Sequence, residues 1–166
     1  EYEDCQFTNC TFVNVDLSDS TFVKCHFDGC NFSMSKINKT SCQEVDFSNC
    51  RLLGLDFSQC NPFLLALNFS DCDLSLVNFT GLSLKDCQFK NCNLQEADFT
   101  AANLTKVQME GCDLDRAVFE NSILEEADFR SATHYKIDPT INSIRGAKFS
   151  LYGLPGLLTQ FEIVIE

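Results

Sequence analysis

Cysteine is the residue type in this chain with the most chemistry available to it. Eleven cysteines occur among 166 residues, and thiolates can bind metals, attack electrophiles or form disulfides. Six of the eleven are evenly spaced, at intervals of 20 or 22 residues. These six are Cys10, Cys30, Cys50, Cys72, Cys92 and Cys112. Such spacing indicates a structural unit that repeats about every 20 residues.

A shorter repeat of five residues runs inside the 20-residue unit. Large apolar residues recur at every fifth position from Phe7 to Phe57 and from Phe69 to Phe129. We call these the central positions of the repeat. Two positions before nearly all of them stands a smaller residue, often with Asp or Asn between the two. We call this smaller position the small inward slot. A period of five fits neither an α-helix nor a flat strand. It predicts an all-β solenoid with four short sides per coil, whose coils stack as parallel rungs roughly 4.8 Å apart.

Counting around the predicted coil places similar central residues on the same side. Side one stacks Phe7, Phe27, Phe47, Phe69, Phe89, Met109 and Phe129; side two Phe12, Phe32, Leu52, Leu74, Leu94 and Leu114; side three Leu17, Ile37, Phe57, Phe79, Phe99 and Phe119; side four Phe22, Cys42, Leu64, Leu84, Leu104 and Leu124. A spacing of twelve residues between Phe57 and Phe69 predicts a two-residue bulge on side four, at Cys60–Phe63. Phe63 has no inward slot there, so it either projects as a contact or packs against the adjacent side.

The cysteines follow the same pattern. Ten of them occupy the small inward slot, and only Cys42 takes a central position. We therefore interpret cysteine as a small core residue. Stacked rungs would hold the Cβ vectors parallel, which is a poor geometry for disulfides. These features predict a reduced protein of the cytoplasm.

The spacing of potential ligands and catalytic residues argues against an enzyme. No cysteine pair has the C-x2-C spacing of a zinc site, and the aspartates lack the glycine-rich repeat of calcium-binding β-helices. His26 lies at an outward position, and His134 lies where the repeat ends without an evident nucleophile nearby. No glycine-rich phosphate loop occurs. We expect no catalysis, no cofactor and no bound metal.

The repeat ends after Ala132, which predicts a coil domain over 1–133 and a capping or dimerisation segment over 134–166. Ala147–Phe149 could add a last pairing segment. A short helix is expected over Tyr152–Phe161, with Leu154, Leu157, Leu158 and Phe161 on one face, and a short strand over Glu162–Ile165. The tail either covers the open end of its own solenoid or pairs with a second copy, and we favour a homodimer. The candidate dimerisation residues are Leu154, Leu157, Leu158, Phe161, Ile163 and Ile165.

The pattern of small residue, Asp or Asn, then Leu or Phe resembles the pentapeptide repeat family. Examples are Ala97-Asp98-Phe99, Ala102-Asn103-Leu104 and Cys112-Asp113-Leu114, and the resemblance covers about residues 5–133. It implies a right-handed quadrilateral parallel β-helix. The tail, with Tyr135–Pro139 and Gly146–Ser150, resembles the end of chromosomal Qnr-like proteins.

Resemblance to the Qnr, MfpA and albicidin-resistance group implies a function. Members of that group are dimeric acidic rods that mimic duplex DNA, bind DNA gyrase and topoisomerase IV, and protect them from quinolones. This chain differs from the plasmid-borne Qnr proteins, because it has a two-residue bulge where those carry long projecting loops.

The charge is compatible with such a partner. The formal net charge is −12, so the surface should repel nucleic acid and attract basic clefts. No apolar run reaches 18 residues, and no membrane span is expected. Two alternatives remain open: a scaffold for another basic partner, or a structural protein without a specific ligand. Besides Phe63, the candidate partner-binding residues on sides one and three are Asp28, Asp46, Asp71, Glu110 and Asp128, and Asp16, Asp19, Asp56, Asp98 and Glu120.

Overall fold

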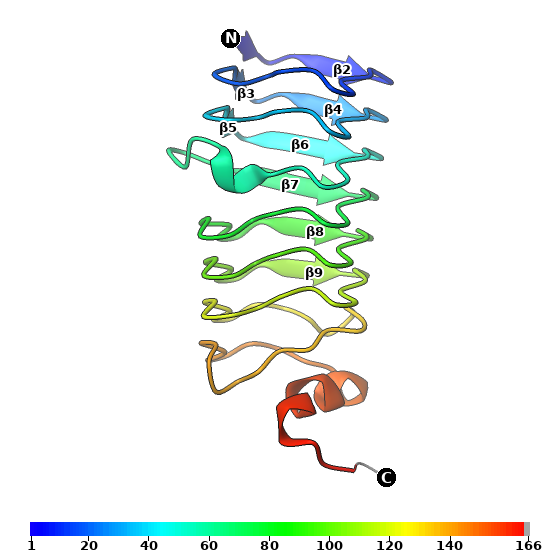
Figure 1. The fold of residues 1–166 in the computed structure, drawn as a ribbon, viewed down its shortest axis with the longest axis vertical. Helices are drawn as coiled ribbons and strands as arrows, with labels where there is room; N and C mark the ends of the chain where they lie inside the picture. Colours follow the sequence, from blue (N-terminus) through cyan, green and yellow to red (C-terminus); the bar gives the residue numbers. More distant parts are fainter. Residues whose placement is uncertain (165–166) are drawn as a thin grey trace.

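A computed structural model describes residues 1–164 and shows a rod of stacked coils that ends in a helical cap (Figure 1). The first strands and the helical cap lie at opposite ends of the rod (Figure 1). Neighbouring coils pair in parallel with the predicted offset of 20 residues, as in Phe7 with Phe27. Across the bulge the offset is 22, as in Phe47 with Phe69. The predicted β-solenoid is therefore confirmed.

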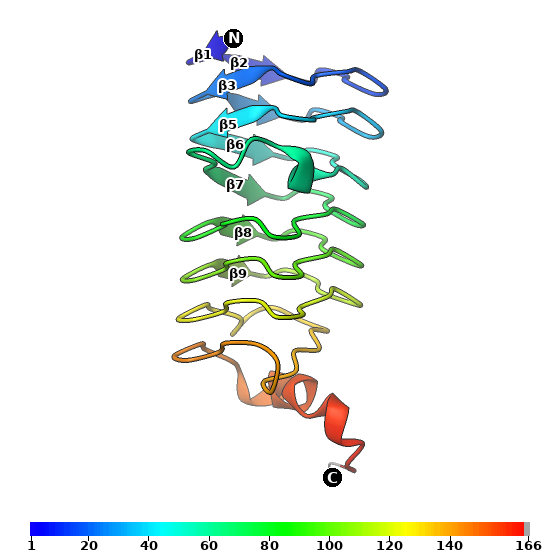
Figure 2. The same cartoon turned by 60° about the vertical axis from the view of Figure 1, so that its left-hand side comes forward.

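Two sides of the coil form regular sheets, and the other two are joined by single bridges such as Asn31 with Arg51. The three-stranded sheet, on side four, has the order β1-β3-β5, and its strands lie one above the other (Figure 2). The six-stranded sheet, on side one, has the order β2-β4-β6-β7-β8-β9. The strands are β1 Tyr2–Glu3, β2 Gln6–Thr8, β3 Thr21–Val23, β4 His26–Asp28, β5 Ser41–Gln43, β6 Val45–Ser48, β7 Leu67–Ser70, β8 Gln88–Lys90 and β9 Gln108–Glu110.

The corners of the coil use left-handed backbone. Most of the positive φ angles fall two positions after a central residue, for example at Asn14 with φ 59°. Asn and Gly tolerate this conformation best. At Gly29 and Gly111 glycine is also needed for space, because a Cβ atom would lie 2.4 and 2.6 Å from the side-chain oxygens of Asn9 and Asn91.

The core is built from stacked rings and small slots. On side one, the rings of Phe27, Phe47, Phe69 and Phe89 stack with centroids 5.1 to 5.3 Å apart, an offset arrangement that aromatic pairs favour. On side three, Phe79 stacks on Phe99 in the same way.

The cysteines fill slots in this core, as predicted. Nine are buried, Cys5 and Cys10 are half-buried, and all eleven are free. The thiol of Cys50 points at the carbonyl of Phe27, 23 residues earlier, at 3.4 Å. The hydroxyl of Thr40 makes the same contact to Leu17 at 2.9 Å, so the slot favours small side chains with a weak donor. Burial raises the pKa of the Cys30 thiol to about 11, which keeps this thiol protonated.

The bulge differs in one respect from the prediction. Asn61 still pairs with Thr40 of the coil before it, and Ala66 donates to Cys42 O, so the extra residues form a loop between these two bonds. This loop follows η1 (Phe57–Gln59) and projects from the rod (Figure 1). Leu64 was predicted to fill the side-four slot, but it has φ 56° and is 59% exposed. Leu65 packs against the core in its place.

The tail continues the coil further than the five-residue repeat does. Lys148 pairs with Asp128, which confirms the predicted last segment, and Phe149 stacks on Phe129 at 5.5 Å. The predicted helix is formed by two 3-10 turns, η2 (Leu151–Leu157) and η3 (Thr159–Phe161).

The predicted strand at the C-terminus is not formed over 162–164, and Ile165 lies outside the described residues. Glu162 has φ 50°, which turns the chain out of an extended path. The predicted common apolar face of the helix is also wrong. Leu157 is buried whereas Leu154 and Phe161 are exposed. The tail forms two short 3-10 segments separated at Leu158, so Phe161 belongs to a different segment from Leu157 and no single helix face is buried.

Candidate functional site: the acidic surface

The candidate site is the set of carboxylates on the outside of the rod. Residues 5–132 carry eighteen acidic and nine basic side chains over about six coils, or roughly 30 Å of axis. Duplex DNA carries one charge per ~1.7 Å of axis. The rod has about the same density of carboxylates, but only about half the density of net charge. The arrangement of the charges therefore decides what the surface can bind.

Aspartates just before a central residue build the coil itself. The carboxylate of Asp56 accepts the N–H of Ser58 at 3.1 Å, and that of Asp98 accepts the N–H of Thr100 at 2.8 Å. Asn78 closes the same local turn with its amide oxygen. The hydroxyl and N–H of Ser18 lower the pKa of Asp16 in this way. The sequence pattern contains this position, but its structural role was not predicted.

A second group of aspartates lies on side one and its following corner, in the second to fourth coils. Asn49 donates to Asp28 at 2.8 Å, Asn68 to Asp46 at 3.0 Å, and Asn91 to Asp71 at 3.1 Å. We call Asp28, Asp46 and Asp71 the amide-held row. Among the ion pairs of residues 1–164, none involves these three carboxylates. Amides orient a carboxylate without cancelling its charge, so the row keeps its negative field.

Several carboxylates of the C-terminal coils are paired with cations. Arg116 lies 3.0 Å from Glu96, Arg145 lies 2.9 Å from Glu125, and Arg130 lies 2.6 Å from Asp128. Hydrogen bonds and charge from Arg130 lower the pKa of Asp128. The carboxylate of Asp128 is only 12% exposed, so this predicted partner-binding residue is largely neutralised.

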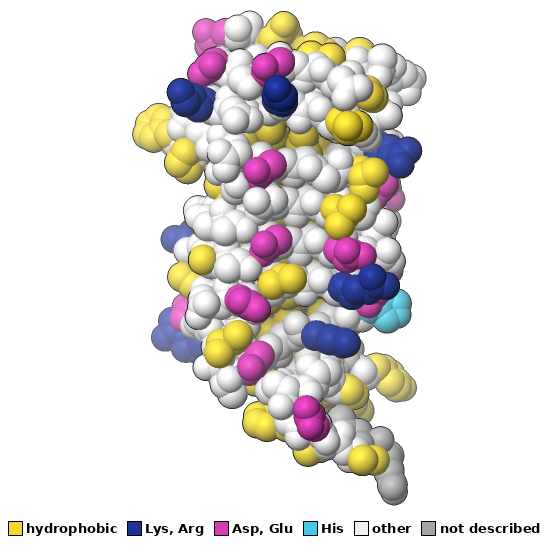
Figure 3. All heavy atoms as spheres, viewed as in Figure 1, with side chains coloured by type: hydrophobic (Ala, Val, Ile, Leu, Met, Phe, Trp, Pro, Cys, Tyr) yellow, Lys and Arg dark blue, Asp and Glu magenta, His cyan; other side chains and the backbone are white. Residues whose placement is uncertain are grey.

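The structure therefore divides the predicted partner-binding residues. On side one, Asp28, Asp46 and Asp71 lie in three consecutive coils at different positions around the coil; Asp28 is half-buried, and Asp46 and Asp71 are exposed. Glu110 is exposed at the end of β9. On side three, Asp16, Asp19 and Glu120 are exposed, whereas Asp56 and Asp98 are half-buried. The face in Figure 3 carries acidic side chains separated by neutral, apolar and basic ones, and not a continuous acidic stripe.

Exposed apolar side chains form a feature that the sequence prediction found only in part. Phe63, predicted as a possible contact, is 67% exposed and projects, with its N–H held by the Asn61 side chain at 3.1 Å. Met34 and Leu76 were not predicted. Both lie at left-handed corner positions and are 75% and 54% exposed. The signal was present, because a large apolar residue two positions after a central one has no inward slot.

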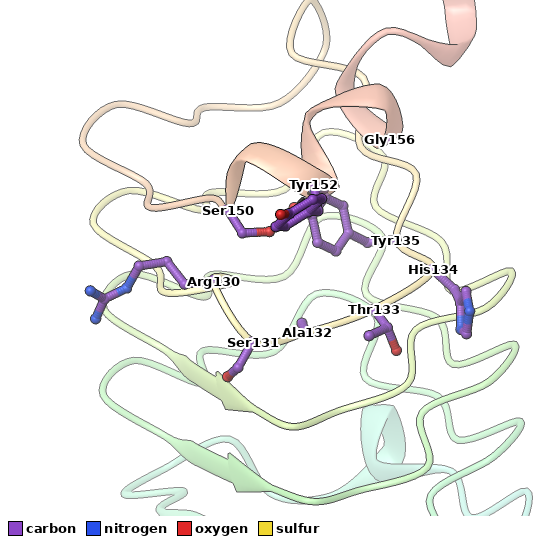
Figure 4. Close-up of a pocket in the computed structure, with 10 residues that line it drawn as sticks. Arg130, Ser131, Ala132, Thr133, His134, Tyr135, Ser150, Tyr152 and Gly156 are labelled. Atoms are coloured by element: carbon purple, nitrogen blue, oxygen red, sulfur yellow. Dashed lines mark hydrogen bonds between the residues drawn. The ribbon is translucent and has the colours of Figure 1, made fainter. Parts of the chain in front are cut away.

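A groove of about 430 Å³ separates the last coil from the cap. Buried Tyr135 lies at its base, and its hydroxyl has no hydrogen-bond partner in the structure. Arg130 and His134 also line the groove, but they point away from Tyr135 (Figure 4). The polar groups do not converge, so the groove is a packing seam between η2 and the coil.

The cap itself exposes apolar side chains at the end of the rod. Leu154, Phe161 and Ile163 are exposed, as are Leu151 and Tyr152, whereas Leu158 is half-buried. No helix in the described part of the chain is long and apolar enough to cross a membrane. Among residues 1–164, no group of three His, Cys, Asp or Glu side chains has a geometry that could hold a metal.

Comparison with known structures places this fold among characterised proteins. Two trypsin-treated variants of QnrB1, a plasmid-mediated fluoroquinolone resistance protein, align with TM-scores of 0.71 and 0.73, at 18% and 19% identity. They cover 99% of this chain, and 91% and 89% of theirs. HetL, a protein involved in regulation of heterocyst differentiation in the cyanobacterium Nostoc, aligns with a TM-score of 0.58 at 16% identity, over 92% of this chain and 88% of its own. These likenesses establish a shared fold.

Sequence comparison identifies the family. A search of curated proteins returned no match. The family description "Pentapeptide repeats (8 copies)" matches residues 3–38 and 66–95, and "Pentapeptide repeat region" matches residues 82–156. Together these matches cover well over half of the chain, in the same residues that form the coils. The chain is a member of the pentapeptide repeat family.

Proposed function

We propose that this chain is an acidic rod that binds DNA gyrase and topoisomerase IV in place of duplex DNA and protects them from quinolones. The observation that carries the proposal is the amide-held row of Asp28, Asp46 and Asp71. The row places one oriented, unneutralised carboxylate in each of three consecutive coils. Coils are ~4.8 Å apart along the rod, and phosphates on one DNA strand rise by ~3.4 Å along the helix axis, so the two sets of charges have a comparable axial spacing. Around the coil the three carboxylates are offset from one another, because Asp28 follows Phe27, Asp46 precedes Phe47 and Asp71 lies two residues after Phe69.

The fold likeness adds support of a limited kind. QnrB1 is a fluoroquinolone resistance protein and HetL is involved in heterocyst regulation, and both share this fold. The fold therefore permits the proposed role and does not select it. The acidic row, which a basic partner would recognise, is the feature that favours this role over the others that the fold permits.

In this proposal the chain acts in the cytoplasm by binding alone, without chemistry of its own. It does so as a homodimer, because the cap exposes Leu154, Phe161 and Ile163 at the end of the rod. A two-fold axis through this end would bury them against the same residues of a second copy and would double the length of acidic surface. Sedimentation analysis that finds only monomer at micromolar concentration would remove the dimer from the proposal.

A gyrase supercoiling assay tests the main proposal. Supercoiling inhibited by ciprofloxacin is titrated with the protein, and we expect recovery at micromolar protein. Without ciprofloxacin, excess protein should compete with DNA and lower supercoiling. If micromolar protein causes neither recovery nor inhibition of supercoiling, gyrase is not the target.

A scaffold for a different partner is the second candidate. It is favoured by the exposed side chains of Met34, Phe63 and Leu76, which duplex mimicry does not require and which are typical of protein contacts. If supercoiling is unaffected, capture of partners from lysate by the protein, compared with a Phe63→Ser variant, would test this candidate.

A further inference from the structure

The junction between coil and cap has its own polar cluster. Thr133 pairs with Asp113 and forms the last rung of side two. His134, with φ 59°, then turns the chain away from the coil. Tyr135 and Ile137 follow and are buried at the end of the core. The N–H of Ile137 donates to Gly156 O of η2 at 3.0 Å. The chain thus leaves the coil at residue 134, contacts the cap through Ile137, and rejoins the coil at Ser143 and Lys148.

Asp113 gathers donors from three successive coils at this point. His134 Nδ1 lies 2.7 Å from one carboxylate oxygen, and Gln95 Nε2 donates to the other at 2.7 Å. The N–H of Asp115 donates to Asp113 as well, at 3.1 Å. The bond to His134 therefore ties the first residue of the junction to the rung before it.

The other charged groups near His134 are Asp115, Arg116 and Glu96. Asp115 adds to the negative field at the imidazole. Arg116 lies 3.0 Å from Glu96 and 3.5 Å from Asp115, so its charge is engaged by these two carboxylates. The net field at His134 thus favours the protonated ring.

We propose that His134 and Asp113 form a pH-sensitive clasp, which holds the cap on the coil when the imidazole is protonated and loosens when it is neutral. The hydrogen bond and charge of Asp113 raise the pKa of His134. A raised folded-state pKa contributes stability that is fully present below the unfolded value of about 6.5 and is lost as the pH rises through the folded value. The cap is therefore held most tightly in mild acid. This inference stands without the proposed partner.

Amide hydrogen exchange of Ile137 tests the clasp, because its bond to Gly156 breaks when the cap opens. After correction for intrinsic exchange, we expect the opening constant to be about two- to fivefold larger at about pH 8.5 than at about pH 5.5, the range of an exposed ion pair. The amide of Thr133, which donates to Cys112 O at 2.9 Å within the coil, should show a smaller change.

The Asp113→Asn variant removes the charge of this side chain but keeps its hydrogen bond within the coil, because an amide oxygen still accepts the N–H of Asp115. In this variant we expect the pH dependence at Ile137 to vanish and the NMR titration of His134 to fall toward about 6.5. His26→Gln, the matched change at the other histidine, should leave the pH dependence intact. An identical pH profile in the wild type and Asp113→Asn, or an unchanged His134 titration, would overturn the clasp.

Discussion

The N-terminal coils and the C-terminal coils have similar net charge but use it differently. Residues 5–80 have eight acidic and four basic side chains, and residues 81–148 have eleven and eight, so the net charges are −4 and −3. In the N-terminal coils asparagine amides hold the carboxylates of Asp28 and Asp46. In the C-terminal coils arginines hold those of Glu96 and Glu125. The two regions are not distinguished by their net charge. They differ in the local electrostatic potential that a bound partner would experience.

The N-terminal and C-terminal coils differ in their surface charges and not in their cores. Substitutions in the two cores should therefore have similar effects. Phe27 in the N-terminal coils and Phe99 in the C-terminal coils are both buried, and each ring stacks on the ring of a neighbouring coil. Replacing either by Ala should lower the free energy of unfolding by about 3 to 5 kcal/mol, because each substitution leaves a cavity the size of a buried ring. Urea unfolding followed by circular dichroism measures this. Values that differ by more than about 2 kcal/mol would show that the cores differ as well.

Gly111→Ala should disturb the amide-held row from within. Its Cβ would lie 2.6 Å from the side chain of Asn91, which holds Asp71. Together with the left-handed strain, we expect a loss of stability of about 2 kcal/mol. Gly54→Ala, at φ 67° with no atom within 4 Å of its Cβ, shares only the strain and should cost about 1 kcal/mol. Equal melting temperatures for the two variants would contradict the contact with Asn91.

Removing the charges of the row should weaken the proposed partner contact. The triple variant Asp28→Asn, Asp46→Asn and Asp71→Asn keeps the shape of each side chain, and we expect about tenfold weaker binding to gyrase, or ~1.4 kcal/mol. The control triple Glu96→Gln, Glu125→Gln and Asp128→Asn removes carboxylates that arginines already hold, changes the net charge equally, and should keep binding within about twofold. Calorimetry or fluorescence anisotropy distinguishes them, and equal losses would mean that only net charge matters.

Acid should release the ion pairs of the C-terminal coils. Arg130 lowers the pKa of Asp128, and Arg145 and Ser143 lower that of Glu125. A lowered folded-state pKa contributes stability present above the unfolded value of about 4 and lost as the pH falls through the folded value. Carbon-13 titration of the Asp128 carboxyl should give a pKa below about 3.9, and Arg130→Gln should raise it. No movement in that variant would refute the pairing.

The smallest effect is expected at Arg116. This side chain is 70% exposed and contacts Glu96 and Asp115, and exposed pairs contribute little stability. Arg116→Gln should change the free energy of unfolding by less than about 0.5 kcal/mol, while it frees two carboxylates in the C-terminal coils. Stronger gyrase binding by this variant would support the idea that ion pairs compensate the negative charge on the surface of the C-terminal coils.

Much of the coil could be predicted because each inward position recurs. A five-residue period specifies a slot and its side, so the rungs, the cysteine slots and the bulge follow from counting. Leu64 was misplaced because counting cannot say which of two adjacent leucines fills a slot when a loop is inserted. The helix of the tail was expected, but its apolar side chains do not share one buried face, because two separate 3-10 segments replaced one continuous helix.

The amino-acid sequence by itself determined the four-sided coil, its register and its acidic composition, because these depend on which residue types recur at which spacing. Only the tertiary structure decided which carboxylates present an uncompensated charge to a partner. That choice depends on whether the neighbour one rung away is an amide, as beside Asp28, or a guanidinium, as beside Glu96. Such neighbours are about 20 residues apart in the chain, and side-chain rotamers decide whether they meet.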